Sequence, residues 1–185
     1  MKKVFIVHGF GGSPNGGWRP YLMAELEKLD IYACALPMPT PEEPVLTKWL
    51  HEIERVVERE KDDEIYLVGH SLGVPTILHF LEKTNRNISG ALLVAGPSSM
   101  LDNEKVNRFL QGEFDFEKIK SVCPRFAIIH GDNDQKVPFS HAEFLKEHLS
   151  CNLVSIKNGG HLNGSSGWLS LPEALTELKK MMNID

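Results

Sequence analysis

The sequence predicts an α/β fold in which one mostly parallel sheet of about six strands lies between two layers of helices. Short apolar runs alternate with amphipathic segments along the whole chain. Most of these runs are hydrophobic at nearly every position, which is typical of strands buried on both faces of a parallel sheet. Alternation of such strands with helices implies right-handed strand–helix–strand units and a three-layer sandwich.

Six apolar runs are expected to form the strands. They are Val4–His8, Ile31–Leu36, Ile65–Val68, Ala91–Ala95, Phe126–His130 and Leu153–Ile156.

Helices are expected between the strands, because apolar residues there recur at intervals of three and four. Two segments carry this pattern at Trp18, Tyr21, Leu22, Leu26 and Leu29, and at Leu46, Trp49, Leu50, Ile53, Val56 and Val57. Further helices are expected over residues 72–81, 103–110, 141–149 and 173–182. Residues 37–44 contain four prolines and are expected to form a loop. Pro75 falls in the first turn of its helix, where it is tolerated.

The composition is that of a globular protein, and the length of 185 residues predicts a single domain over 1–185. Hydrophobic residues make up 42% and charged residues 24%, which fits a soluble chain. The net charge is −5 and no cluster of lysine or arginine stands out. We therefore expect no nucleic-acid partner.

The chain is expected to be cytoplasmic. The apolar run after the two N-terminal lysines ends after four residues, too short for an export signal. No stretch approaches the ~18 apolar residues of a membrane span, so no membrane partner is expected. Cys34, Cys123 and Cys151 are widely spaced among apolar residues. This spacing favours buried thiols in a reducing compartment over disulfides.

Residues 69–73 read Gly-His-Ser-Leu-Gly and stand between an expected strand and an expected helix. This order of strand, G-x-S-x-G and helix is the context of a nucleophile elbow. The turn is so tight that a Cβ atom at Gly69 or Gly73 would clash, and it presents a strained serine at the carboxyl end of the sheet. A glycine-rich turn with an incidental serine is the alternative. Because both flanking elements fit, we expect Ser71 to be a nucleophile.

A serine nucleophile needs a base to take its proton and an acid to orient the base. In enzymes with this elbow the acid and then the histidine follow the serine along the chain. His161 follows two glycines after the sixth expected strand and is the candidate base. Asp134 has the usual position of the acid in G-x-x-D-x-x-V-P, whose Pro138 is expected to open the next helix. Asp132 is the alternative acid and is otherwise expected to brace the turn.

Two backbone N–H groups are expected to bind the oxyanion of acyl transfer. One belongs to Leu72, directly after the serine. The other belongs to Phe10, in the loop that reads His-Gly-Phe-Gly-Gly at residues 8–12. A glycine-rich loop at this place can also bind phosphate, but G-x-G-x-x-G is absent and no Gly-Lys-Ser/Thr follows. A nucleotide-binding function is therefore set aside.

The other histidines and tryptophans are expected to have mainly structural roles. His8 and His70 are expected to hydrogen-bond to loop backbone, and His130 to support the acid loop. Trp18 and Trp168 follow the oxyanion and histidine loops, so they are candidate walls of the substrate pocket as well as packing residues. No set of His, Cys and Asp has the spacing of a zinc site, and no metal or cofactor is expected.

Further motifs extend the pattern over most of the chain: His8-Gly9 with Trp18 downstream, Leu36-Pro37-Met38-Pro39 leading to Trp49, Pro75 after the elbow, Val137-Pro138-Phe139-Ser140, Gly159-Gly160-His161 and Leu171-Pro172. With these motifs the chain resembles the small serine hydrolases of the α/β-hydrolase superfamily called the retinoblastoma-binding protein nine or YdeN-type family. The resemblance implies a compact hydrolase without a large lid, with Ser71, Asp134 and His161 as its triad. It implies no particular substrate, and retinoblastoma binding is not carried over because no L-x-C-x-E stretch occurs.

About thirty residues separate Ala95 from the strand at Phe126, in the region where a cap could lie. They include the expected helix 103–110 and a short helix around Phe116–Ile119. This length is enough for one or two short helices but not for a lid domain. We therefore expect a small, open site that suits modest acyl groups.

The leading hypothesis is a serine esterase that cleaves small carboxylic esters, its small-molecule substrates, through an acyl-enzyme. Thioester and activated-amide hydrolysis are variants of the same chemistry. The other class is a non-catalytic interaction protein on the hydrolase fold. The complete set of triad and oxyanion residues argues against that class.

Overall fold

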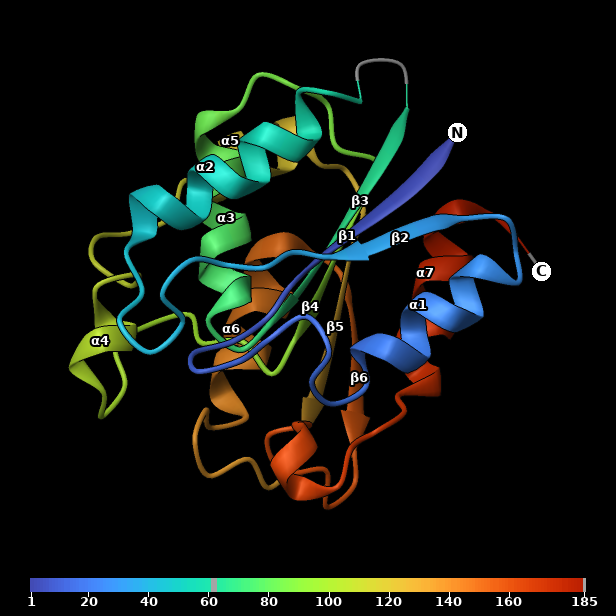
Figure 1. The fold of residues 1–185 in the computed structure, drawn as a ribbon. Helices are drawn as coiled ribbons and strands as arrows, with labels where there is room; N and C mark the ends of the chain where they lie inside the picture. Colours follow the sequence, from blue (N-terminus) through green and yellow to red (C-terminus); the bar gives the residue numbers. More distant parts are fainter. Residues whose placement is uncertain (61–62, 185) are drawn as a thin grey trace.

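A computed structural model describes residues 1–60 and 63–184, and at its centre lies one sheet of six strands (Figure 1). Every pair of neighbouring strands is parallel, and their spatial order is β2-β1-β3-β4-β5-β6. The six expected strands and their parallel arrangement are confirmed. Their bounds are β1 Lys2–Val7, β2 Tyr32–Ala35, β3 Glu64–His70, β4 Gly90–Val94, β5 Phe126–Gly131 and β6 Asn152–Ile156.

Helices cover both faces of this sheet, as the three-layer prediction requires (Figure 1). Buried side chains of α1 and α7 belong to the core on one face, and those of α2, α3, α5 and α6 belong to the core on the other. The bounds are α1 Arg19–Glu27, α2 Leu46–Val57, α3 Gly73–Lys83, α4 Glu104–Asn107, α5 Phe116–Val122, α6 Ser140–Leu149, the 3₁₀ helix η1 Gly164–Ser166 and α7 Pro172–Met182.

Burial along the strands explains their hydrophobic runs. All five residues of β4, and all of β3 after Glu64, are buried, because these central strands have a layer of helices on each face. The edge strands β2 and β6 keep exposed positions, since each has a neighbour on one side alone.

The strand order places the loops that matter for the site. The chain runs from β1 outward to β2 and then returns to the other side of β1 to form β3. The order therefore reverses between β1 and β3, and the carboxyl ends of strands at such a switch point are where doubly wound sheets bind ligands. The loop with Phe10 follows β1 and the turn with Ser71 follows β3, so both lie at this switch point.

The extent of α4 and the start of α6 differ from the sequence prediction. The expected helix 103–110 is an α-helix over Glu104–Asn107 alone, because Phe109 and Leu110 continue it with tighter i→i−3 hydrogen bonds that carry their side chains into the core. Pro138 does not open α6, which begins two residues later at Ser140. The residues from Pro138 to Phe139 instead form a turn, in which the Pro138 carbonyl accepts the N–H of His141 at 3.0 Å.

Smaller features complete the fold. The short helix expected around Phe116 is present as α5, whereas η1 was not expected. Cys123 is buried as predicted, but Cys34 and Cys151 are only half-buried, because both flank or lie in edge strands; all three thiols are free. Within the part of the chain that the structure describes, every helix is too short or too polar to cross a membrane.

Candidate active site

Ser71 lies in the tight turn between β3 and α3, and its backbone has the left-handed conformation of a nucleophile elbow. Its φ is +53°, a region that L-residues seldom adopt and that costs energy. The turn is held by a 2.9 Å hydrogen bond from the Ser71 N–H to the Val94 carbonyl of β4. A Cβ atom at Gly69 would lie 2.9 Å from the Gly73 backbone, and one at Gly73 would lie 2.3 Å from the Val7 carbonyl oxygen. The two glycines are therefore required sterically, as the motif predicts.

The structure brings Ser71, His161 and Asp134 together although 90 and 27 residues separate the successive pairs. His161 Nε2 lies 2.9 Å from Ser71 Oγ, and His161 Nδ1 lies 2.7 Å from Asp134 Oδ2. An ionised carboxylate can only accept, so Nδ1 carries the imidazole proton and Nε2 is free to accept the Ser71 hydroxyl proton. This is the tautomer that a general base requires.

Asp134 is held by its own loop after β5. Its Oδ1 accepts the N–H of Lys136 at 2.8 Å and that of Val137 at 3.0 Å, which leaves Oδ2 to face His161. Burial alone would raise the pKa of the Asp134 carboxyl, but the hydrogen bond with His161 and the two backbone donors outweigh it and lower the pKa below its ordinary value. The carboxylate therefore stays ionised in the neutral range.

His130, the residue expected to support the acid loop, does so from the end of β5. It is fully buried, and its Nε2–H donates to the Val137 carbonyl at 2.8 Å. The same nitrogen lies 3.5 Å from Asp134 Oδ2. Burial lowers the pKa of the His130 imidazole, so the ring is neutral and supports the carboxylate as a dipole.

Asp132, the alternative acid, has no hydrogen bond to the His161 ring in the described structure; it braces the loop that carries this histidine. Its Oδ1 accepts the N–H of Asn158 at 2.7 Å, and the neighbouring Asn133 Oδ1 accepts the N–H of Gly160 at 2.8 Å. The role of Asn133 was not predicted, since nothing in the sequence pairs it with a loop about thirty residues away. Geometry thus favours Asp134 over Asp132 as the partner of the base.

The residues that carry the two expected oxyanion donors come from segments next to the nucleophile. Leu72 directly follows Ser71, and Gly9, the neighbour of Phe10, is so close that a Cβ atom there would lie 2.8 Å from Ser71 Cβ. In the described part of the chain, neither the Phe10 N–H nor the Leu72 N–H donates a hydrogen bond to the protein. Both donors are therefore available to an external acceptor.

His8 and His70 hydrogen-bond to loop backbone, as expected. His8 Nδ1–H donates to the Gly9 carbonyl at 2.8 Å, and His70 Nε2–H donates to the His161 carbonyl at 3.0 Å. Burial lowers the pKa of both imidazoles, that of His70 to about 3. They therefore hold the oxyanion and histidine loops as neutral groups.

The candidate pocket walls have different surroundings. Trp18 is fully buried, its indole Nε1–H donates to the Leu162 carbonyl at 2.9 Å, and its ring packs on the edge of His70. Trp18 therefore supports the histidine loop from behind and is not a pocket wall; the sequence could not show that the loop after β6 would cover it. Trp168 is half-buried, and its role at the pocket stays a prediction.

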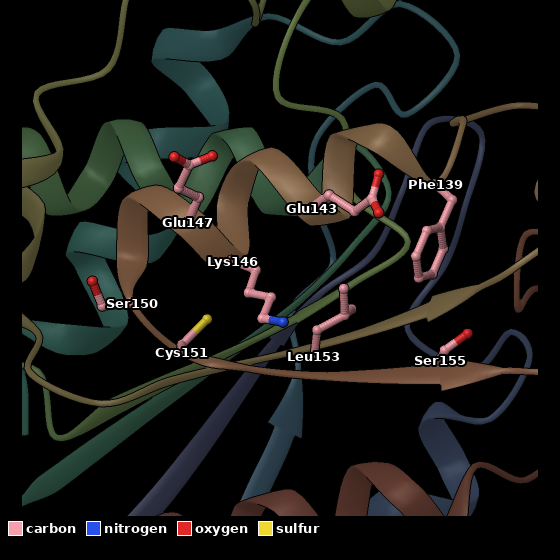
Figure 2. A pocket seen from close by; sticks show the side chains of 8 residues that line it. All are labelled: Phe139, Glu143, Lys146, Glu147, Ser150, Cys151, Leu153 and Ser155. Carbon is pink, nitrogen blue, oxygen red and sulfur yellow. The ribbon is translucent and has the colours of Figure 1, made fainter.

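Two hollows of the described structure lie away from Ser71. A cavity of about 670 Å³ lies between α6 and the edge strand β6, where it is lined by Lys146, Cys151 and Leu153 among others (Figure 2). A second, of about 540 Å³, lies along α2. Neither is lined by a residue of the candidate triad.

Known proteins match this chain over most of its length. The family model described as Serine hydrolase matches residues 4–180. The hydrolase YdeN of Bacillus subtilis is 35% identical over 174 residues, which cover 92% of this chain and 91% of YdeN. The serine hydrolase RBBP9 of Rattus norvegicus is 26% identical over 168 residues, which cover 88% of each chain.

Solved structures share the fold. The crystal structure of the ydeN gene product from B. subtilis has a TM-score of 0.93 at 33% identity and covers 99% of this chain and 100% of its own. Est1E from Butyrivibrio proteoclasticus has a TM-score of 0.76 at 19% identity, over 98% of this chain and 87% of its own. The fold is thus that of the α/β-hydrolases.

Proposed function

The chain belongs to the serine hydrolase family, and from this premise we propose that it hydrolyses small carboxylic esters. Ser71 is the nucleophile, His161 the general base and Asp134 the acid that orients the base. The observation that carries the proposal is the unbroken line of hydrogen bonds from Asp134 through His161 to Ser71, at 2.7 and 2.9 Å.

The proposed reaction has an acylation and a deacylation step. Ser71 Oγ attacks the ester carbonyl carbon while its proton passes to His161 Nε2. The carbonyl electron pair moves onto the oxygen, which then accepts hydrogen bonds from the backbone N–H groups of Phe10 and Leu72. When the tetrahedral intermediate collapses, the alcohol leaves with the proton from Nε2. Water then attacks the acyl-enzyme in the same way, which releases the carboxylic acid and restores the serine.

The experiment that tests this function is turnover of a panel of p-nitrophenyl esters, acyl thioesters and activated anilides by the purified protein. We expect ester hydrolysis with a burst of p-nitrophenol, because an acyl-enzyme accumulates when deacylation is slow. Turnover of the thioesters and anilides shows whether the protein also hydrolyses thioesters and activated amides. Absence of turnover on the whole panel, with the protein folded, would favour a non-catalytic interaction protein.

The pH dependence of the reaction should show a single ionisation. Burial lowers the pKa values of His8, His70, His130 and His141, so these rings stay neutral over the neutral range. The base His161 must be neutral to accept the Ser71 proton. We therefore expect kcat/KM to rise with pH through one step and then to level off. A rate that rises toward acid pH would remove His161 as the base.

A loss of activity caused by unfolding at acid pH has to be distinguished from the pH dependence of kcat/KM. His70 has a folded pKa of about 3 against an ordinary histidine value of about 6.5, so the unfolded chain binds its proton first. The stability that His70 contributes is therefore complete above about pH 6.5 and is lost as the pH falls toward 3. Tryptophan fluorescence measured at each pH would identify the range in which the protein is still folded.

Acyl-chain preference follows from the cap region between β4 and β5, which holds α4 and α5 and no larger unit. Lys105 of α4 donates to the Glu42 carbonyl at 3.1 Å and pairs with the Glu43 carboxylate, which ties α4 to the proline-rich loop. Its Nζ also lies 5.8 Å from the centre of the Phe10 ring, so α4 is beside the oxyanion loop. We expect acetyl and butyryl p-nitrophenyl esters to be hydrolysed faster than dodecanoyl esters. Rates measured above and below the solubility limit should show no jump. A preference for long chains, or activation by emulsions, would reveal a mobile lid.

A further inference from the structure

Arg19 is a buried cation that the proposed reaction does not use. Its side chain is 6% exposed, and its Nε–H donates to the Ser13 carbonyl at 2.9 Å. Among residues 1–60 and 63–184, no carboxylate forms an ion pair with this guanidinium and no acceptor takes its terminal N–H groups. A buried charge without a partner is costly, so a guanidinium in this state is suited to receive an anion.

The start of helix α1 adds a second positive end at the same place. Arg19 is the first residue of this nine-residue helix, whose N-terminus has neither a side-chain cap nor an acidic residue in its first turn. Pro20, the second residue, has no N–H, so the helix dipole and the remaining free N–H groups are what make this end attractive to anions. Because helical side chains tilt toward the N-terminus, the guanidinium lies on this side of the helix, against Ser13 and Gly16.

Gly16 leaves the guanidinium accessible. A Cβ atom at Gly16 would lie 2.6 Å from Arg19 Nη2, and Gly16 itself is only half-buried. A side chain at position 16 would therefore push against Nη2, whereas glycine leaves it uncovered. Among the described residues, the terminal nitrogens of Arg19 are not in the set of fully buried atoms that lack a partner, so they keep some contact with solvent.

This loop joins the two halves of the candidate active site. It continues directly from the oxyanion loop, and Gly17 packs against Gly164, which follows His161 in the histidine loop. The charge of Arg19 also contributes to the lowered pKa values of His8 and His70, the residues beside Gly9 and Ser71. An anion held by Arg19 would thus lie beside the loop that continues from the oxyanion loop.

We propose that Arg19 binds an anionic group of the ester substrate, so that the preferred substrates are esters that also carry a free carboxylate. This inference rests on the proposed esterase function and names its substrate class. A guanidinium presents paired N–H donors that match a carboxylate. Burial lowers the pKa of Arg19 only to about 10, so the cation is retained at neutral pH.

The test compares esters of equal length with and without the charge. For the acyl side the pair is p-nitrophenyl hydrogen adipate and p-nitrophenyl hexanoate, and for the alcohol side it is p-acetoxybenzoate and its methyl ester. We expect the wild type to have the lower KM for the anionic member of one pair. Arg19→Gln should raise that KM by on the order of tenfold or more, as loss of a charge-assisted hydrogen bond does, and so lower the ratio of anionic to neutral kcat/KM by a similar factor. The KM of Arg19→Lys for the anionic ester should lie between those of the wild type and Arg19→Gln, because lysine keeps the positive charge but lacks the paired N–H donors of a guanidinium.

The matched control is Arg55→Gln, which removes the same charge from a surface ion pair with Glu52 on α2. It should leave the anionic preference unchanged. If Arg19→Gln does not fold, Gly16→Ala takes its place, since the added methyl group displaces Nη2. Equal ratios of anionic to neutral turnover in the wild type and in Arg19→Gln, with esters still hydrolysed, would overturn the inference and leave the proposed function standing.

A binding measurement decides the inference even if no ester is turned over. Free adipate should raise the melting temperature of the wild type and of Arg55→Gln but not that of Arg19→Gln, because a ligand stabilises the state that binds it. No shift in any of the three proteins at millimolar adipate would contradict an anion site at Arg19.

Discussion

Replacing Ser71 with alanine is expected to lower kcat on the preferred ester by on the order of 10³-fold or more, because a triad acts as a unit. The Ser71 hydroxyl contacts His161 and makes no other side-chain hydrogen bond in the described structure, so its loss leaves the fold supported. Steady-state kinetics on both proteins measure the effect, and melting curves confirm that the variant is folded.

The control for this substitution is Ser165→Ala. Ser165 lies on η1, after the histidine loop, and its hydroxyl donates a hydrogen bond to Asn163 Oδ1 at 3.1 Å. We expect its activity to stay close to that of the wild type. If Ser71→Ala kept most of the ester hydrolysis, the nucleophile would have to be another residue.

The Asp134→Asn substitution should lower kcat by on the order of 10³- to 10⁴-fold. Asparagine can keep the two backbone hydrogen bonds at Oδ1, but its NH₂ group faces His161 Nδ1 where Oδ2 accepted a hydrogen bond from Nδ1–H. The imidazole of His161 then carries its proton on Nε2, and a protonated Nε2 cannot accept the hydroxyl proton of Ser71. The loss therefore comes from the wrong tautomer and not from unfolding.

Asp132→Asn is the matched comparison for the acid. Its amide oxygen can still accept the Asn158 N–H, so the brace between the two loops is kept and the effect on kcat should be far smaller. Kinetics and thermal melting of both variants belong together, because each aspartate holds its loop. A larger loss of kcat in Asp132→Asn than in Asp134→Asn would exchange the roles of the two aspartates.

Much of the fold could be predicted because the central strands are buried on both faces. The uninterrupted apolar runs of β3 and β4 are a direct consequence of the helices above and below them. The elbow could be predicted for a local reason, since Gly69 and Gly73 leave no room for a Cβ atom within one turn. The family resemblance drawn from these motifs is confirmed by matches over most of the chain.

Other features depend on contacts between distant segments and could not be predicted. Helix α4 ends early because Phe109 packs against Trp49, and Trp18 is buried because the loop after β6 covers it. Asn133 holds a loop about thirty residues further along the chain. Arg19 reads as an ordinary helical surface residue, and its burial becomes visible only when Ser13 and Gly16 fold around it.

The central claim, that Ser71 is an activated nucleophile, is tested most directly by mapping where a fluorophosphonate attaches. The purified protein is labelled, digested, and its peptides are sequenced by mass spectrometry. One adduct per chain on Ser71, prevented by prior incubation with a slowly hydrolysed ester, is the result that we predict. An adduct on another serine, or no adduct while ester hydrolysis persists, would contradict the assignment of Ser71.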